Sequence, residues 1–239
     1  MVQAVKEARP GAAPRVIASP RAAAIAIDDM SLTDKAYLQL EEMIATLKLA
    51  PGTVLSEQVL VKELGIGRTP VREALQRLGR DGLLAVLPRR GILVSEINLR
   101  SQLRLLETRR VLENLVARAA AERASDAEIE TFAEIARNMR LAASSADDIA
   151  FMRLDRAFNE LVVAAARNEF ALRALGSMSS LSRRFWYQHY KEAADLPLCA
   201  NLHADVSEAI AARDPAAAAR NSDKLMDYIE SFARRTLDT

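Results

Sequence analysis

The chain has 239 residues, half of them apolar, and its 33 basic and 32 acidic side chains leave a net charge of +1. This length fits one large or two small domains. The neutral balance excludes bulk positive charge as the basis of nucleic-acid binding, so any such site has to come from local clustering. A single cysteine, Cys199, excludes an internal disulfide. No apolar run reaches the length of a membrane helix, so we expect a cytoplasmic protein with no membrane partner.

Residues 1–30 are predicted to be a disordered N-terminal extension. The basic residues Lys6, Arg9, Arg15 and Arg21 stand there among many alanines, and several prolines interrupt any long helix. An arginine-rich start is also typical of an organelle transit peptide, and this alternative stays open.

Residues 31–97 show the element order of a winged helix-turn-helix. Apolar residues recur at helical spacing up to residue 81, and two short apolar runs around a turn then indicate a β-hairpin. The predicted elements are a helix from a Thr33 cap to about residue 50, a helix from a Ser56 cap to Gly65, a helix over 69–81, and strands at 83–87 and 92–94.

Residues 98–239 are predicted to form an all-α antiparallel helical bundle, which makes the protein mainly α. Helical periodicity continues through this part, and polar or proline-containing breaks divide it. The predicted helices lie near 98–123, 126–143, 147–167, 168–193, 196–212 and 215–236.

Arginines gather around the third predicted helix and the hairpin turn. Arg68 and Arg72 lie one turn apart at the start of the helix, so both would face the major groove if the helix entered it N-terminus first. The Thr69 hydroxyl and the first-turn backbone can take a phosphate. Arg89 and Arg90 stand at the hairpin tip, where a wing touches flanking DNA. A solvated basic helix with an ordinary hairpin is the structural alternative.

Polar residues also face the predicted interior of the bundle. Around the helix axis, Arg109, Asp155, Asn159, His203 and Asn221 each fall on an apolar arc. This pattern predicts a polar pocket inside an apolar bundle, in which Arg109 binds a ligand carboxylate. Asp155, Asn159 and His203 would bind a metal or hydrogen-bond the ligand directly. The alternative is an internal network, with Asp155 paired to Arg109 or His203.

Several motifs resemble the GntR family of bacterial regulators. They are LSEQ at 55–58, LGIGRTPVREAL at 64–75, Asp81-Gly82-Leu83 and Arg90-Gly91. The helical second half resembles the branch with a FadR-like FCD effector domain. The resemblance covers residues 32 to about 236.

The resemblance implies a homodimer that binds a short palindromic operator in double-stranded DNA. It places Arg68, Thr69 and Arg72 on DNA and matches Gly91 to the wing glycine. Gln58 stands where the family often has arginine, and Gly67 stands where serine or threonine is common. For residues 98–239 it implies effector binding and dimerisation, with a small organic acid as the effector.

The resemblance also raises the question of a divalent metal such as zinc or nickel. Many FCD domains carry an aspartate, a histidine four residues later and two further histidines. Asp155 matches the aspartate and His203 one histidine, but Asn159 and Leu225 stand where the other two are expected. This incomplete ligand set favours a metal-free pocket, as in the acyl-CoA-binding branch.

The leading hypothesis is therefore a ligand-responsive transcriptional regulator, and not an enzyme. Two other classes stay open at this point. One is an architectural DNA-binding protein without an effector. The other is a metal-dependent enzyme fused to a DNA-binding module, in which Asp155 and His203 activate water.

Overall fold

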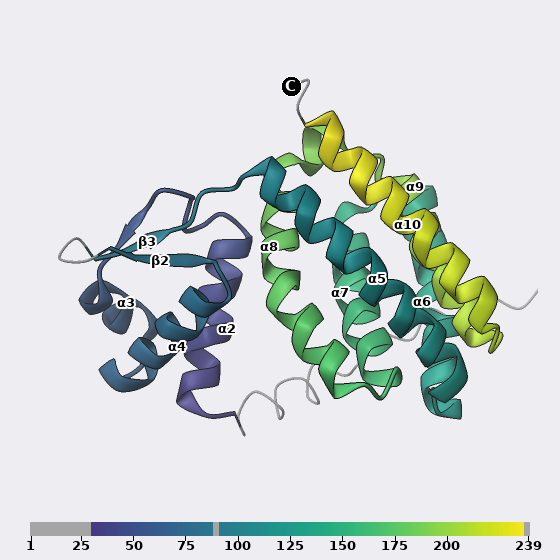
Figure 1. The fold of residues 1–239 in the computed structure, drawn as a ribbon, viewed down its shortest axis with the longest axis horizontal. Coiled ribbons are helices and arrows are strands. Elements are labelled where there is room, and N and C mark those ends of the chain that lie inside the picture. The colour runs from purple at the N-terminus through teal and green to yellow at the C-terminus, as the bar shows by residue number, and fades with distance from the viewer. Residues whose placement is uncertain (1–29, 88–90, 237–239) are drawn as a thin grey trace, which may run out of the picture.

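The computed structural model describes residues 30–87 and 91–236, and within them it has a winged helix-turn-helix followed by an all-α bundle (Figure 1). The fold class predicted from the sequence is thereby confirmed. The prediction of a disordered extension over residues 1–30 falls, up to residue 29, outside the described residues.

The winged helix-turn-helix packs its helices against a small antiparallel sheet. Its elements are α2 (Leu32–Ala45), β1 (Val54–Leu55), α3 (Glu57–Leu64), α4 (Arg68–Arg80), β2 (Leu84–Leu87) and β3 (Gly91–Val94). The strand order is β1-β3-β2, and in the β2–β3 hairpin Leu84 lies opposite Val94. Leu40, Val71 and Leu78 are fully buried between the helices, so the apolar spacing of α2 and α4 points into this core.

Two local features differ from the sequence prediction. The N-cap of helix α2 is Ser31, two residues before the predicted cap. The Ser31 side chain accepts a hydrogen bond from the backbone N–H of Asp34 at 3.1 Å. The predicted cap, Thr33, donates its hydroxyl to Glu73 at 2.8 Å and thereby ties α2 to α4. Strand β1 was not predicted, because two residues are too few to show an alternation of apolar and polar side chains. They form a strand only by pairing with β3.

The bundle contains every helix predicted for it. The helices are α5 (Leu99–Arg123), α6 (Asp126–Ser145), α7 (Asp148–Ala165), α8 (Glu169–Ala193), α9 (Leu196–Ala211) and α10 (Pro215–Arg235). Their starts follow from side-chain caps, among them the Ser125–Glu128 capping box of α6 and the caps Asn168 and Asp214.

Helix pairing in the bundle buries one extensive core. Helix α6 packs along α9, and α5 packs along α10. Phe132, Met139 and Ile210 are fully enclosed between these layers. No helix in residues 30–87 and 91–236 combines the length and the hydropathy needed to cross a bilayer.

Helix α8 is the part of the bundle that lies beside α2 of the winged helix (Figure 1). Leu181 of α8 packs against the winged-helix core. The buried Arg184 donates to the carbonyl oxygens of Ser95 and Glu96, at 2.7 and 3.4 Å, in the linker between β3 and α5. Burial lowers the pKa of the Arg184 guanidinium. One stretch of α8 therefore contacts both the winged helix-turn-helix and its linker.

Candidate functional site

The first turn of α4 presents the DNA-reading residues expected from the sequence. Gly67 is the N-cap, and Arg68, Thr69 and Arg72 are all exposed on the turn that follows it. The opposite face of α4, with Val71, is buried in the winged-helix core. This helix can therefore offer two guanidinium groups and its N-terminal backbone donors to a duplex without loss of packing.

Sequence reasoning missed Glu57, which holds both arginines in the DNA-free protein. Its carboxylate accepts from Nε and Nη2 of Arg72, each at 3.2 Å, and lies 3.9 Å from Nε of Arg68. Glu57 opens α3 directly after Ser56, and this acidic first-turn position was the available signal. Arg72 is therefore already paired with a carboxylate of its own domain.

Two further residues predicted from the sequence to bind DNA, Gln58 and Gly91, lie in the same domain. Gln58 is exposed on α3 next to Glu57. Gly91 begins β3 at a φ of +100°, a conformation that favours glycine, and is exposed at the wing. Arg89 and Arg90 lie outside the described residues.

A cavity of about 1090 Å³ runs through the bundle and reaches the DNA-binding domain. Arg109, Asp155, Asn159 and His203 all line it, as their helical positions predicted. At its other end the cavity is lined from α2 and α4, at Tyr37, Glu41, Glu42, Arg77 and Asp81. Its size suits a drug-sized ligand.

Inside the bundle, Asp155 and His203 form a hydrogen-bonded pair. The Oδ1 atom of Asp155 lies 3.0 Å from Nε2 of the buried His203, whose Nδ1 donates to the Cys199 carbonyl oxygen at 2.8 Å. Asn159 donates its amide to the same Asp155 oxygen at 3.0 Å. The Asp155 side chain keeps 31 % of its surface exposed, because it borders the cavity.

Each member of this pair stabilises the charge of the other. Burial alone disfavours the imidazolium, but the Cys199 sulfur and the Asp155 carboxylate outweigh it and raise the pKa of His203 well above its ordinary value. Burial likewise opposes the Asp155 carboxylate, but the hydrogen bond from His203 and the charges of His203 and Arg109 lower the pKa of Asp155. The hydrogen bond between Asp155 and His203 matches the internal network that the sequence left open as an alternative.

Arg109 is also already paired. Its Nε and Nη2 atoms donate to Oε1 of Glu113, one helical turn further along α5, at 3.1 and 2.5 Å. Both side chains are largely buried. A ligand carboxylate would therefore meet Arg109 together with its own counter-ion.

The donor set at Asp155, Asn159 and His203 does not fit the divalent metal considered from the sequence. A zinc or nickel site needs three or four ligands with available lone pairs. Asp155 and His203 are two such ligands and Asn159 supplies only an amide, while Leu225 contributes an apolar side chain to the cavity wall. Among residues 30–87 and 91–236, no three His, Cys, Asp or Glu side chains are placed to hold a metal.

Asn221, the fifth inward residue expected from the sequence, does not line the cavity. Its amide donates to the carbonyl oxygen of Asp205 on α9 at 2.9 Å. Its neighbour Ser222, about 100° further around the helix, is the polar residue among the described α10 residues that line the cavity. The expectation for Asn221 is therefore corrected by one position.

Sequence reasoning also missed four cavity-lining residues whose side chains have no hydrogen-bond partner among residues 30–87 and 91–236. They are Gln102, Ser180, Ser182 and Ser222, and each is at most 9 % exposed. We call them the unpartnered set. The available signal was the serine-rich middle of α8, because serine is a poor residue for a helix interior unless its side chain has another role.

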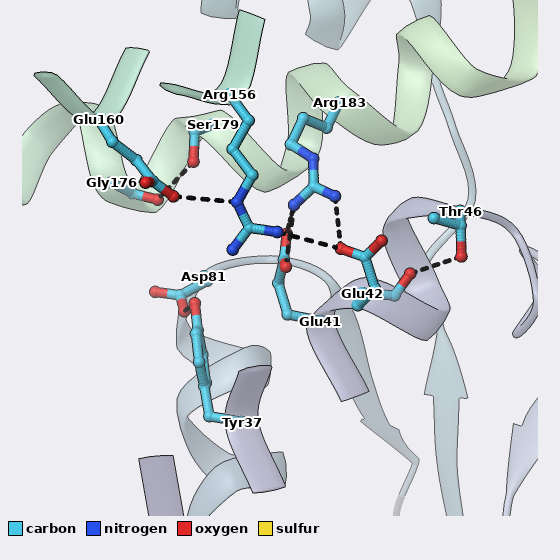
Figure 2. Close-up of polar contacts among 10 residues, drawn as sticks. All are labelled: Tyr37, Glu41, Glu42, Thr46, Asp81, Arg156, Glu160, Gly176, Ser179 and Arg183. Atoms are coloured by element: carbon cyan, nitrogen blue, oxygen red, sulfur yellow. Dashed lines mark hydrogen bonds and ion pairs between the residues drawn. The ribbon is translucent and has the colours of Figure 1, made fainter. Parts of the chain in front are cut away.

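At its outer end the cavity meets a cluster of ion pairs between the two domains (Figure 2). Arg183 of α8 donates to both carboxylate oxygens of Glu41 at 3.0 and 3.1 Å and to Glu42 at 2.6 Å. Arg156 of α7 pairs with Glu160 at 2.9 Å and lies 3.9 Å from Glu42. Burial opposes the Arg183 charge, but Glu41 and Glu42 together raise the pKa of this guanidinium.

Comparison with family models covers both domains. Residues 32–94 match the model described as bacterial regulatory proteins, gntR family, and residues 104–227 match the FCD domain. Both resemblances drawn from the sequence motifs are thereby confirmed.

Similar proteins are transcriptional regulators. The HTH-type transcriptional repressor RspR of Escherichia coli strain K12 is 26 % identical over 199 residues, which are 83 % of this chain and 87 % of that protein. The Nta operon transcriptional regulator of Aminobacter aminovorans is 30 % identical over 144 residues, 59 % of this chain and 67 % of that protein. The solved structure of Escherichia coli McbR/YncC has the same fold, with a TM-score of 0.76, 20 % identity, and coverage of 87 % of this chain and 99 % of that one.

Proposed function

Because this chain belongs to the GntR family of bacterial transcriptional regulators and carries a C-terminal FCD domain, we propose that it binds a palindromic operator as a homodimer under the control of a small effector. It is a DNA-binding regulator and not an enzyme, so the metal-dependent enzyme considered from the sequence is set aside. Operator binding assigns it to the cytoplasm, where the bacterial chromosome lies.

The observation that carries effector control is the extent of the cavity. The same hollow is lined by Asp155 and His203 in the bundle and by Glu41 and Asp81 of the DNA-binding domain. A ligand that prefers one arrangement of these walls changes the equilibrium between orientations of the two domains. Because operator binding by a dimer requires a set spacing between recognition helices, such a change alters operator affinity.

DNA contact is assigned to the exposed first turn of α4, with the wing beside it. Arg72 reads a base edge in the major groove after it leaves Glu57, while Arg68 and Thr69 hold phosphates. Gln58 and Gly91 lie in the same domain, and Arg89 and Arg90, which precede Gly91 in the sequence, are assigned to contact with flanking DNA.

Operator binding is tested by fluorescence anisotropy with duplexes from the region around the chain's own gene. Arg72→Ala is expected to weaken binding to the preferred duplex by about 1–3 kcal/mol, the contribution of a bidentate base contact. Arg118→Ala removes the same charge from an exposed position on α5 and serves as the control. Equal affinity of the Arg72 variant and the control would remove Arg72 from the interface.

The expectation of an organic acid as effector depends on Arg109, which would bind the carboxylate of the ligand. In the folded protein that acid has to share Arg109 with Glu113. Binding experiments must therefore compare organic acids with neutral compounds. A thermal-shift screen with small organic acids and neutral compounds measures whether any ligand stabilises the protein. No stabilisation by any compound would support the architectural alternative, in which the cavity has no effector.

A further inference from the structure

We propose that the cavity binds an uncharged amphipathic molecule, which the unpartnered set recognises through the hydroxyl or amide groups of the ligand. This inference rests on the proposed effector function of the same cavity, and it replaces an organic acid with a neutral ligand class. Four buried hydrogen-bonding side chains, the charge balance of the bundle and the aromatic walls support it.

The unpartnered set is the first observation. Gln102 of α5, Ser180 and Ser182 of α8, and Ser222 of α10 line the cavity, and the described part of the chain offers none of them a side-chain hydrogen bond. Of the four, only the Ser182 hydroxyl oxygen is fully enclosed without a partner among the described residues, so the polar atoms of Gln102, Ser180 and Ser222 are the ones open to a ligand in the cavity. A ligand with neutral donors and acceptors would replace water as the hydrogen-bond partner of these three side chains.

The charges in the bundle part of the cavity are the second observation. Arg109 is neutralised by Glu113, and the imidazolium of His203 by Asp155. An anion placed there would be a buried charge without a free counter-ion, which is strongly unfavourable. Arg153 and Arg173 also line the cavity, but both are exposed, so water screens any attraction they exert.

The cavity walls are the third observation. Between the polar groups they are apolar and rich in aromatic rings, including Phe151, Phe158, Trp186 and Phe232. Rings of this kind pack against flat apolar surfaces. The ligand class that fits all three observations is a molecule with an apolar, preferably aromatic, body and several neutral hydroxyl or amide groups.

The first test compares neutral and anionic probes of the same skeleton. Full-length protein is titrated by calorimetry at pH 7.5 with the pairs benzamide and benzoate, 4-hydroxybenzyl alcohol and 4-hydroxybenzoate, and indole-3-acetamide and indole-3-acetate. We expect the neutral member of at least one pair to bind roughly tenfold more tightly than its acid, as one unfavourable buried charge predicts. Tighter binding of the acids, or no binding by any neutral probe, would overturn the inference.

The second test uses two matched serine variants. Ser222 and Ser207 are both buried serines, but only Ser222 lines the cavity. Ser222→Ala is expected to weaken binding of the neutral probe roughly five- to tenfold through loss of one hydrogen bond, while Ser207→Ala leaves it unchanged. Equal binding by both variants would overturn the inference.

Operator binding measured on the same preparations separates this inference from the proposed function. If acids bind the cavity and alter operator affinity, the effector function stands and only the neutral ligand class is wrong. If no probe binds and operator affinity never responds to a ligand, both are wrong.

Discussion

Removal of Arg183 should destabilise the contact between the two domains more than removal of its partner Glu41. The carboxylate of Glu41 has only 8 % of its side-chain surface exposed, and Arg183 is the cation that it contacts. Arg183, in contrast, also donates to Glu42 at 2.6 Å. Arg183→Gln therefore leaves a buried carboxylate without a counter-ion, whereas Glu41→Gln leaves a guanidinium that is still paired.

The magnitudes follow from this asymmetry. Charges about 4 Å apart attract by about 4 kcal/mol at an effective dielectric constant of 20, before desolvation is subtracted. Stranding one member of a buried pair costs about 3–5 kcal/mol, and we take about 3 kcal/mol for Arg183→Gln because Glu41 borders the cavity. Glu41→Gln loses charge assistance but strands no charge, so it should cost about 1–2 kcal/mol.

The assay is urea-induced unfolding followed by far-ultraviolet circular dichroism at one fixed protein concentration, with both single variants and the double variant. The double variant strands no charge at Glu41, so it should cost no more than Arg183→Gln alone, with a coupling energy of about 1–2 kcal/mol. Glu122→Gln, on the exposed side of α5, controls for the loss of a carboxylate. Equal costs for the two single variants, or costs that add, would refute the reasoning.

Two further predictions concern the DNA-binding face and the ion pair in the bundle. Glu57→Gln frees Arg68 and Arg72 from their counter-ion, so we expect about fivefold tighter DNA binding at low salt by anisotropy, and weaker binding would mean that Glu57 positions Arg72 for DNA. The pKa of His203 is higher in the folded protein than its ordinary 6.5, so its stabilising contribution is complete below about pH 6.5 and is lost as the pH rises through the folded pKa. The wild-type free energy of unfolding should therefore fall from pH 6.5 upward relative to that of Asp155→Asn, and parallel pH profiles would contradict this.

Much of the fold was predictable because the relevant interactions are local. The capping residues Ser125, Asn168 and Asp214 act on backbone groups two or three positions away, and the apolar spacing of α4 repeats within one helix. Strand β1 escaped prediction because its two residues form a strand only through pairing with β3.

The candidate sites were predictable in outline but not in their pairing. Helical periodicity placed Arg109, Asp155, Asn159 and His203 toward the interior, and the structure brings all four to one cavity. Periodicity could not show that Glu57 binds Arg72, because α3 and α4 meet only after the turn between them forms. It also missed Asn221 by one residue, since a small rotation of α10 decides which side chain borders the cavity.

The family and the fold class follow from the amino-acid sequence alone, because motif spacing, caps and periodicity act within one turn or along one helix. Which polar side chains pair with each other depends on the tertiary structure, because their partners lie on helices that are distant in the sequence. Arg183 binds Glu41, which lies 142 positions away in the chain, whereas the hydroxyl of Ser182 on the same helix has no partner in the described part of the chain. Side-chain pairing at such separations depends on the relative rotation and distance of whole helices, which no local pattern encodes.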